Sequence, residues 1–131
     1  MRLLLDTHVW LWLQAEPERL SRRARKALSD PSVELYFSVA STWEIAVKVA
    51  LGKLRLPEEP ETYVLSRLRL DGVRTVAIDN AHALLAARLP YHHKDPFDRL
   101  LLAQASVEGL RLCTADEQLR AYEVELLWAG R

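Results

Sequence analysis

Four carboxylic acids in this chain each stand where an apolar segment gives way to a turn or to the start of a helix; they are Asp6, Glu44, Asp98 and Asp116. If the apolar segments are parallel strands of one sheet, the four acids meet at the same edge, where open α/β sheets bind their ligands. Carboxylates gathered in one place repel one another and are costly to desolvate, so they need a cation beside them. The spacing therefore predicts a metal site.

The expected ligand atoms are all oxygens, which favours a hard cation such as Mg²⁺ or Mn²⁺. His92 and His93 are adjacent in the chain rather than one helical turn apart, so we do not expect them to form a zinc-binding pair. His8 and His82 are isolated, and we expect them to pack or to cap locally. The chain has neither a Gly-rich phosphate loop nor a GxSxG motif, which argues against P-loop nucleotide hydrolysis and serine-hydrolase chemistry.

Each acid taken singly also has a structural explanation. Asp6 could cap a short helix that begins directly after it. Glu44 ends the sequence Ser41-Thr42-Trp43-Glu44, which fits a capping box at a helix start, and it could instead pair with Lys48 one turn later. These alternatives stay open for the single residues, but independent helix caps need not converge on one point.

Asp95 and Asp98 have different expected roles, although they are only three residues apart. Asp95 fits the N-cap position of a helix, and Pro96 fits the first helical position. Asp98 then falls at the third helical position, from which we expect it to point toward the sheet edge. Asp116 could cap a short helix over residues 117–121, and Asp79 needs no role beyond capping the helix that follows it.

Short apolar runs predict four buried strands, over residues 3–5, 33–37, 73–78 and 110–113. Residues 122–128 alternate apolar and charged side chains, which predicts a half-buried edge strand. Helices are expected over residues 21–29, 41–51, 61–70, 79–89 and 96–108, with Gly52 and Gly109 as stop signals. This alternation of strands and helices predicts an α/β fold with three layers, α/β/α, around a central and mainly parallel sheet.

The composition is that of an ordinary globular protein. The 131 residues suit one domain over residues 1–131, and 50% hydrophobic with 27% charged residues excludes a disordered chain. The apolar stretch near the N-terminus is too short for a signal peptide, and no segment could span a bilayer, so we expect a cytoplasmic protein without membrane contact. The single cysteine, Cys113, lies in an apolar run and is expected to be a buried thiol.

The charge balance limits how this protein could hold nucleic acid. The formal net charge is zero, from 18 basic and 18 acidic residues, so bulk charge does not hold a polyanion. Any contact with nucleic acid must come from local basic clusters, of which one lies at residues 19–26 and another comprises His92, His93, Lys94 and Arg99. Solvated surface explains such clusters more often than binding does.

Four motifs together resemble a known family, and they run in order from Leu3 to about Trp128. They are Leu3-Leu4-Leu5-Asp6-Thr7-His8, Ser41-x-Trp43-Glu44-Ile45-Ala46-x-Lys48, His93-Lys94-Asp95-Pro96-Phe97-Asp98-Arg99-Leu100-Leu101-x-Ala103-Gln104-Ala105 and Thr114-Ala115-Asp116. The set resembles the PIN domain and, more narrowly, the VapC-like toxins of toxin–antitoxin pairs. The small residues Ala103 and Ala105 match the family pattern when it is counted from Asp98, which favours Asp98 over Asp95 as the third acid.

The resemblance implies a Mg²⁺-dependent ribonuclease whose acidic residues fall on Asp6, Glu44, Asp98 and Asp116. As a hypothesis, these four acids bind the metal and activate water, while Thr7 and Thr114 hold the acids or their waters in place without binding the metal themselves. Candidates for contact with RNA phosphates are Lys48, His93, Lys94 and Arg99.

The resemblance also implies partners, namely a small antitoxin protein and a second copy of the chain in a homodimer. Trp10, Trp12 and Leu13 could line a groove for the antitoxin, and core packing explains them equally well. The alternative function is a PIN-like module that binds RNA or a partner without cutting. A phosphatase or receiver domain is disfavoured, because a receiver would need a lysine near the last strand.

Overall fold

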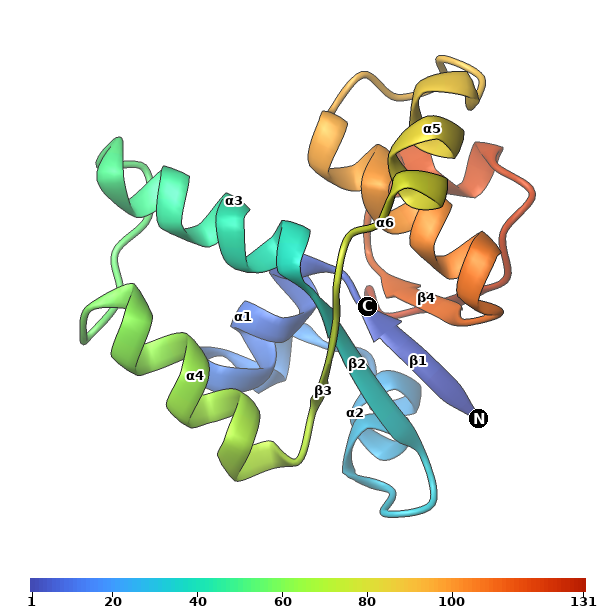
Figure 1. Cartoon of the computed structure of the whole chain (residues 1–131). Helices are drawn as coiled ribbons and strands as arrows, with labels where there is room; N and C mark the ends of the chain where they lie inside the picture. The colour runs from blue at the N-terminus through green and yellow to red at the C-terminus, as the bar shows by residue number, and fades with distance from the viewer.

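A computed structural model describes all 131 residues and shows a five-stranded sheet with helices on both faces (Figure 1). The strands are β1 Arg2–Leu5, β2 Glu34–Ser38, β3 Arg74–Val76, β4 Arg111–Thr114 and β5 Leu126–Trp128. Their spatial order is β3-β2-β1-β4-β5, and every neighbouring pair is parallel. All five expected strands are present, and the expected three-layer α/β/α fold is confirmed. The expectation that the strand over residues 73–78 is buried is wrong, because β3 lies at the edge of the sheet and is mostly exposed, and β5 covers only the last part of the expected strand over residues 122–128.

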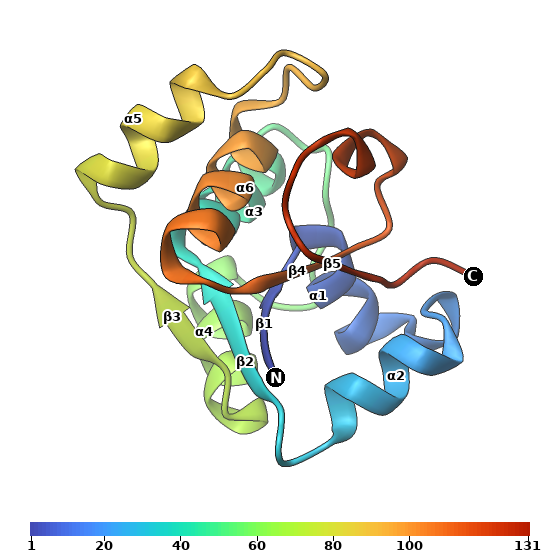
Figure 2. The same ribbon diagram turned by 90° about the vertical axis from the view of Figure 1, so that its right-hand side faces the viewer.

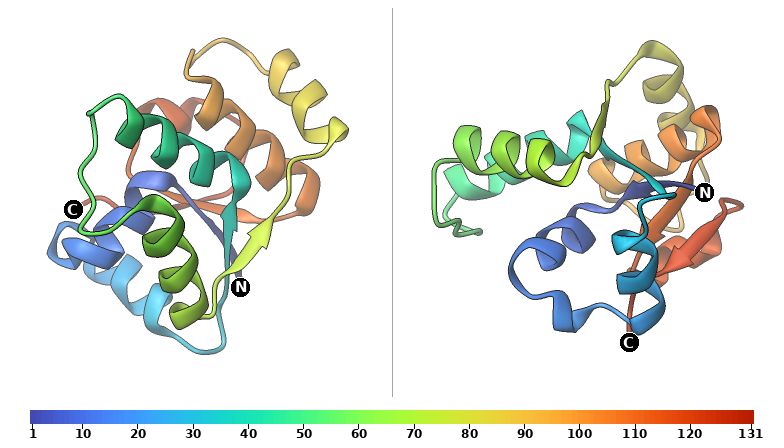
Figure 3. Two further views of the ribbon diagram at one scale, coloured as in Figure 1. Left: turned by 60° about the vertical axis from the view of Figure 1, so that its left-hand side comes forward. Right: turned by 90° about the horizontal axis from the view of Figure 1, so that it is seen from below.

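Six α-helices cover the sheet. They are α1 Thr7–Ala15, α2 Arg22–Ser29, α3 Val39–Ala50, α4 Pro60–Asp71, α5 Asn80–Arg88 and α6 Pro96–Glu108, with short 3₁₀ helices η1 at Pro17–Arg19 and η2 at Glu117–Ala121. Figure 2 shows α5 and α6 on one side of the sheet and α1 and α2 on the other. In Figure 3, α3 and α4 lie side by side, and α4 packs Tyr63, Val64 and Leu68 into the core on the same face as α1. None of these helices is long and apolar enough to cross a membrane.

The central strand β1 separates two apolar cores, because successive side chains of a strand point to opposite faces. Leu3 and Leu5 face the larger core with Trp10, whereas Leu4 faces the smaller core with residues of α6 such as Leu101. All of these side chains are fully buried. Trp10 is therefore a core residue, which decides between the two explanations open for it in the sequence.

The expected buried thiol is confirmed. Cys113 lies on β4 with no exposed surface. Burial is the main reason that its pKa is raised to about 12, and the charge of Asp6 adds to it. Cys113 is therefore protonated at neutral pH and is a packing residue rather than a nucleophile.

Helix α3 starts earlier than the sequence indicated, and this removes one explanation for Glu44. The expected helix over residues 41–51 begins at Val39, because the hydroxyl of Ser38 accepts the Ala40 N–H at 2.9 Å and caps the helix. The proposed capping box of Ser41 and Glu44 is therefore wrong. Glu44 lies in the second turn of α3, so its side chain does not cap this helix.

The other predicted caps are present. Asp95 accepts the N–H groups of Phe97 and Asp98, at 2.8 and 3.3 Å, and Pro96 is the first residue of α6. Asp79 caps α5 in a capping box that uses the ring of His82. Gly109 ends α6 with a φ of 65°, a conformation that glycine adopts without a steric penalty. Asp98 is thus fixed at the third position of α6, as expected.

The buried side chain of Arg99 holds the loop between α5 and α6. Its guanidinium donates to four backbone carbonyls at 2.6–3.2 Å and stacks 4.0 Å from the ring of Tyr91; the carbonyls belong to Ala86, Leu89, Pro90 and His93. Only 5% of Arg99 is exposed. Arg99 is thus occupied by the backbone of its own chain, contrary to the expectation that it contacts RNA phosphates.

We predict that replacing Arg99 by methionine lowers the free energy of unfolding by about 3 kcal/mol, because buried carbonyls at the end of α5 lose their donor. Chemical denaturation followed by circular dichroism measures this change. Arg88→Met is the matched control, since Arg88 is an exposed arginine at the end of α5. It is expected to change the free energy of unfolding by less than about 0.5 kcal/mol. Equal effects of the two substitutions would contradict the role given to Arg99.

Candidate metal centre

The parallel pairing of β1 and β4 brings Asp6 and Asp116 to the same edge of the sheet. Asp6 follows β1 directly, and its N–H donates to the carbonyl of Cys113 at 3.0 Å. Asp116 comes two residues after β4. Thr114, the last residue of β4, joins the two acids, because its hydroxyl donates to Asp6 Oδ2 at 2.6 Å and accepts the Asp116 N–H at 3.1 Å.

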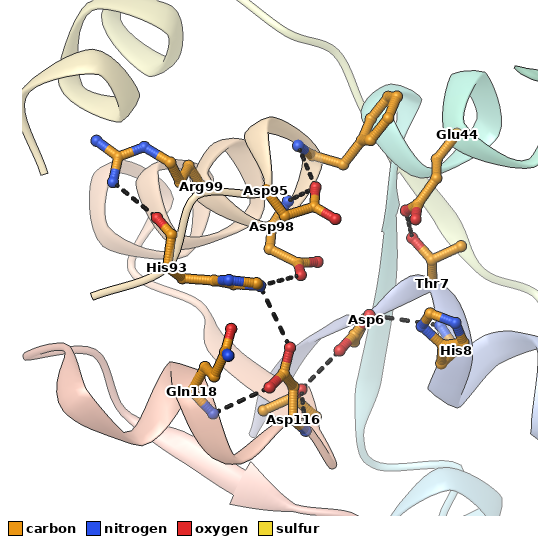
Figure 4. Close-up of polar contacts among 12 residues, drawn as sticks. Asp6, Thr7, His8, Glu44, His93, Asp95, Asp98, Arg99, Asp116 and Gln118 are labelled. Atoms are coloured by element: carbon orange, nitrogen blue, oxygen red, sulfur yellow. Dashed lines mark hydrogen bonds and ion pairs between the residues drawn. The ribbon is translucent and has the colours of Figure 1, made fainter. Parts of the chain in front are cut away.

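Asp98 joins this pair from the first turn of α6, on the far side of a histidine. The Nε2 atom of His93 lies 2.7 Å from Asp98 Oδ2 and 3.4 Å from Asp116 Oδ2 (Figure 4). The three donor atoms of His93, Asp98 and Asp116 all lie within 4.8 Å of one another. The sequence did not indicate that His93 belongs to this cluster. The one available signal was its position five residues before Asp98, in the loop that leads into α6.

Glu44 stands beside the cluster with both carboxylate oxygens already bonded. The hydroxyl of Thr7 lies 2.8 Å from Glu44 Oε1 and 2.7 Å from the hydroxyl of Ser41. Thr7 has one proton, so it donates to the carboxylate and accepts from Ser41. The ammonium of Lys48 lies 2.6 Å from Glu44 Oε2. Only 2% of Glu44 is exposed, but the side chain of Lys48 is 34% exposed, so the pair is partly buried and not fully exposed as the sequence suggested.

The acids of the cluster are electrostatically costly as they stand. Burial raises the pKa of Asp98 to about 7, the charges of Asp6 and Asp95 add to this, and the bond to His93 opposes it. Burial likewise raises the pKa of Asp6, against the hydrogen bond from Thr114. Both carboxyl groups therefore hold their protons more tightly than ordinary aspartates. A divalent cation would offset this cost, so the donor set fits a metal ion.

A pocket of about 250 Å³ opens onto Asp6 and Asp116, between α1 and the end of β4. It is lined by Asp6, His8, Trp12, Ala115 and Asp116. Trp12 is therefore partly a pocket residue, unlike Trp10. Lys94 is exposed in the same loop as His93, so its predicted contact with RNA phosphates stays a prediction.

Comparison with known proteins identifies the family of this chain. The profile of the family described as PIN domain matches residues 3–125. Ribonuclease VapC22 of Mycobacterium tuberculosis is 38% identical over 123 residues, which cover 92% of this chain and 91% of that protein. Ribonuclease VapC16 of the same organism is 36% identical over 76 residues, which cover 53% of this chain and 54% of that protein.

Solved structures share the fold at lower sequence identity. The structure of VapBC2 from Rickettsia felis, bound to a DNA fragment from its promoter, superposes with a TM-score of 0.74 at 12% identity, and covers 99% of this chain and 100% of that one. A FitAB complex bound to a DNA fragment gives a TM-score of 0.65 at 21% identity, covering 95% and 93%. The match of the PIN profile to most of the chain, together with the extended identity to VapC22, shows that this chain belongs to the PIN domain family and is VapC-like.

Proposed function

We propose that this chain is a metal-dependent endoribonuclease and the toxin of a VapBC-like toxin–antitoxin pair. The observation that carries the proposal is the convergence of Asp6, Asp98 and Asp116 beside a pocket at the carboxyl edge of the sheet. The relationship to VapC22 and VapC16, both named ribonucleases, supports RNA as the substrate. The same acids weigh against the alternative of a binding module that does not cut.

Asp6, Asp98 and Asp116 would hold the ion, which we expect to be Mg²⁺ or Mn²⁺. When bound, such an ion lowers the pKa of water and offsets negative charge on the phosphoryl oxygens. Thr114 orients Asp6 through its 2.6 Å hydrogen bond. We propose that Glu44 does not bind the ion directly, because its carboxylate already bonds to the Thr7 hydroxyl and the Lys48 ammonium. Lys48 and Lys94 are the proposed contacts for RNA phosphates.

The proposed partner is a small antitoxin protein. Four of the solved structures with this fold are VapBC or toxin–antitoxin complexes, from Rickettsia felis, Haemophilus influenzae, Klebsiella pneumoniae and Salmonella typhimurium, which supports such a partner here. Homodimer formation stays a prediction. Exposed apolar side chains such as Trp43, which is 59% exposed, are available for either contact.

We predict that the purified chain cleaves RNA in Mg²⁺ or Mn²⁺ and not in EDTA, and that Asp98→Asn lowers the cleavage rate by more than about 100-fold. End-labelled RNA resolved on a sequencing gel measures the rate and maps the cut sites. Asp79→Asn is the matched control, because asparagine also caps helices and Asp79 lies outside the cluster. Cleavage that survives in Asp98→Asn would reject the site, and intact RNA binding without cleavage would favour the non-catalytic module.

The stabilisation of the folded chain by Mg²⁺ should increase with pH. Since the pKa of Asp98 is raised to about 7 and that of Asp6 is also raised, the metal-free protein loses stability as the pH climbs from about 4 through about 7. A cation bound to the ionised carboxylates removes that loss. The rise in melting temperature on adding Mg²⁺ should therefore be larger near about pH 8 than near about pH 5.

Differential scanning fluorimetry in Mg²⁺ and in EDTA measures this rise at each pH. The Asp98→Asn variant serves as the reference, and its response to Mg²⁺ should be small and nearly independent of pH. A shift that has the same size in the wild-type protein at both pH values would show that these carboxylates do not bind the ion.

Co-expression tests the partner. Expressed with the product of the neighbouring gene, the chain is expected to elute as a complex whose ribonuclease activity is lower than that of the free chain. Size-exclusion chromatography with light scattering gives the composition of the complex and reports whether the free chain is a dimer. If the two products elute separately, the neighbouring gene does not encode the antitoxin.

A further inference from the structure

The imidazole of His93 occupies a position among the acids that the proposed function leaves unexplained. Its Nε2 atom faces Asp98 at 2.7 Å and Asp116 at 3.4 Å, and only 14% of its side chain is exposed (Figure 4). The ring therefore points inward to the carboxylates. A side chain that serves to contact an RNA phosphate would present its nitrogen to solvent, as the exposed Lys94 does.

The backbone on both sides of this ring is fixed by buried groups. The His93 N–H donates to the hydroxyl of Tyr122 at 2.9 Å, and that hydroxyl donates to the Pro90 carbonyl at 2.6 Å. The His93 carbonyl accepts from Arg99 at 3.2 Å. Both polar groups of the peptide backbone at His93 are thus held by side chains from other elements. Hydrogen bonds of this kind hold a functional side chain in a single position and orientation.

The separations between the donor atoms match those of ligands on one ion. Donors about 2.1 Å from an octahedral ion lie about 3 Å apart when they occupy neighbouring positions. The distances from Nε2 to the two carboxylate oxygens, 2.7 and 3.4 Å, lie on either side of this value. An ion could therefore take its place between these three side chains with small shifts of the donor atoms.

We propose that His93 is a direct ligand of the metal ion in this chain, in addition to Asp6, Asp98 and Asp116. The centre is then a mixed nitrogen and oxygen site rather than an all-oxygen site. Imidazole binds first-row transition metals in preference to Mg²⁺, so the site favours Mn²⁺ over Mg²⁺. The inference rests on the metal centre of the proposed function, but it does not depend on RNA being the substrate.

Electron spin-echo spectroscopy of the Mn²⁺-loaded protein tests this assignment without any measurement of activity. A directly bound imidazole couples its nitrogen nucleus to the Mn²⁺ electron spin. We expect this coupling in the wild-type protein, with a changed pattern when the histidines carry the heavy nitrogen isotope. The coupling should be lost in His93→Gln and kept in His8→Gln. His8 is the matched control because its imidazole lines the same pocket as Asp6.

Competition between Mn²⁺ and Mg²⁺ gives a second readout. The ratio of the two affinities, measured by calorimetry, should fall by at least about tenfold in His93→Gln, because the nitrogen ligand is what separates the ions. Circular dichroism establishes that the variant is folded. If the variant does not fold, a wild-type spectrum without nitrogen coupling still overturns the role of His93, and loss of the coupling in His8→Gln would assign it to His8 instead.

The outcomes distinguish the role of His93 from the existence of the metal centre. Wild-type protein that binds Mn²⁺ without nitrogen coupling, or coupling that persists in His93→Gln, overturns the role of His93 and leaves the carboxylate centre intact. Failure of the wild-type protein to bind Mn²⁺ at all overturns the proposed metal centre as well. Coupling that disappears only in His93→Gln supports the assignment.

Discussion

The cost of burying several carboxylates together, first through lost hydration and then through their repulsion, governs the arrangement around this site. Asp6 and Asp98 both have raised pKa values, with burial as the main cause; the charge of Asp6 raises the pKa of Asp98 further, and the charge of Glu44 adds to the rise at both. A fold that carries this cost needs compensating groups nearby. Thr114 supplies one by donating to Asp6, and His93 supplies another by facing Asp98. The polar residues around the acids are thus explained by the charges that they offset.

The same constraint divides the four predicted acids into two groups. Glu44 has its own cation in Lys48 and its own hydroxyl in Thr7, so its charge is offset within the protein more than those of the aspartates, although it still raises the pKa values of Asp6 and Asp98. The cluster of Asp6, Asp98 and Asp116 is bonded to the hydroxyl of Thr114 and the ring of His93, and neither a lysine nor an arginine pairs with these three acids. An added cation gains most where the charge is least balanced. This difference is why we place the ion among the three aspartates and put Glu44 further out.

How far the sequence predicts this site depends on how local each determinant is. Asp6 and Asp116 follow apolar runs that pair in parallel, and Asp98 is placed by the local cap at Asp95, so all three were within reach of sequence patterns. The start of α3 was misplaced because Ser38 and Ser41 are both plausible caps, and only the end of β2 decides between them. The burial of Arg99 and the position of His93 depend on contacts with other elements, which no spacing along the chain reveals.

Arg99 and Asp98, adjacent on α6, act on opposite sides of the same loop. Asp98 contacts the ring of His93, while Arg99 bonds the carbonyls of the segment that carries this ring. The geometry of the site is therefore set by the packing of α5 against α6 and not by the loop alone. A change that loosened this packing would move His93 relative to Asp98 and Asp116 before it disturbed the acids themselves, because Asp116 is held from β4. Asp6 and Asp116 are thus positioned by the strands, whereas His93 is positioned by the loop between α5 and α6. Changes in that loop are therefore expected to alter which ion the site prefers.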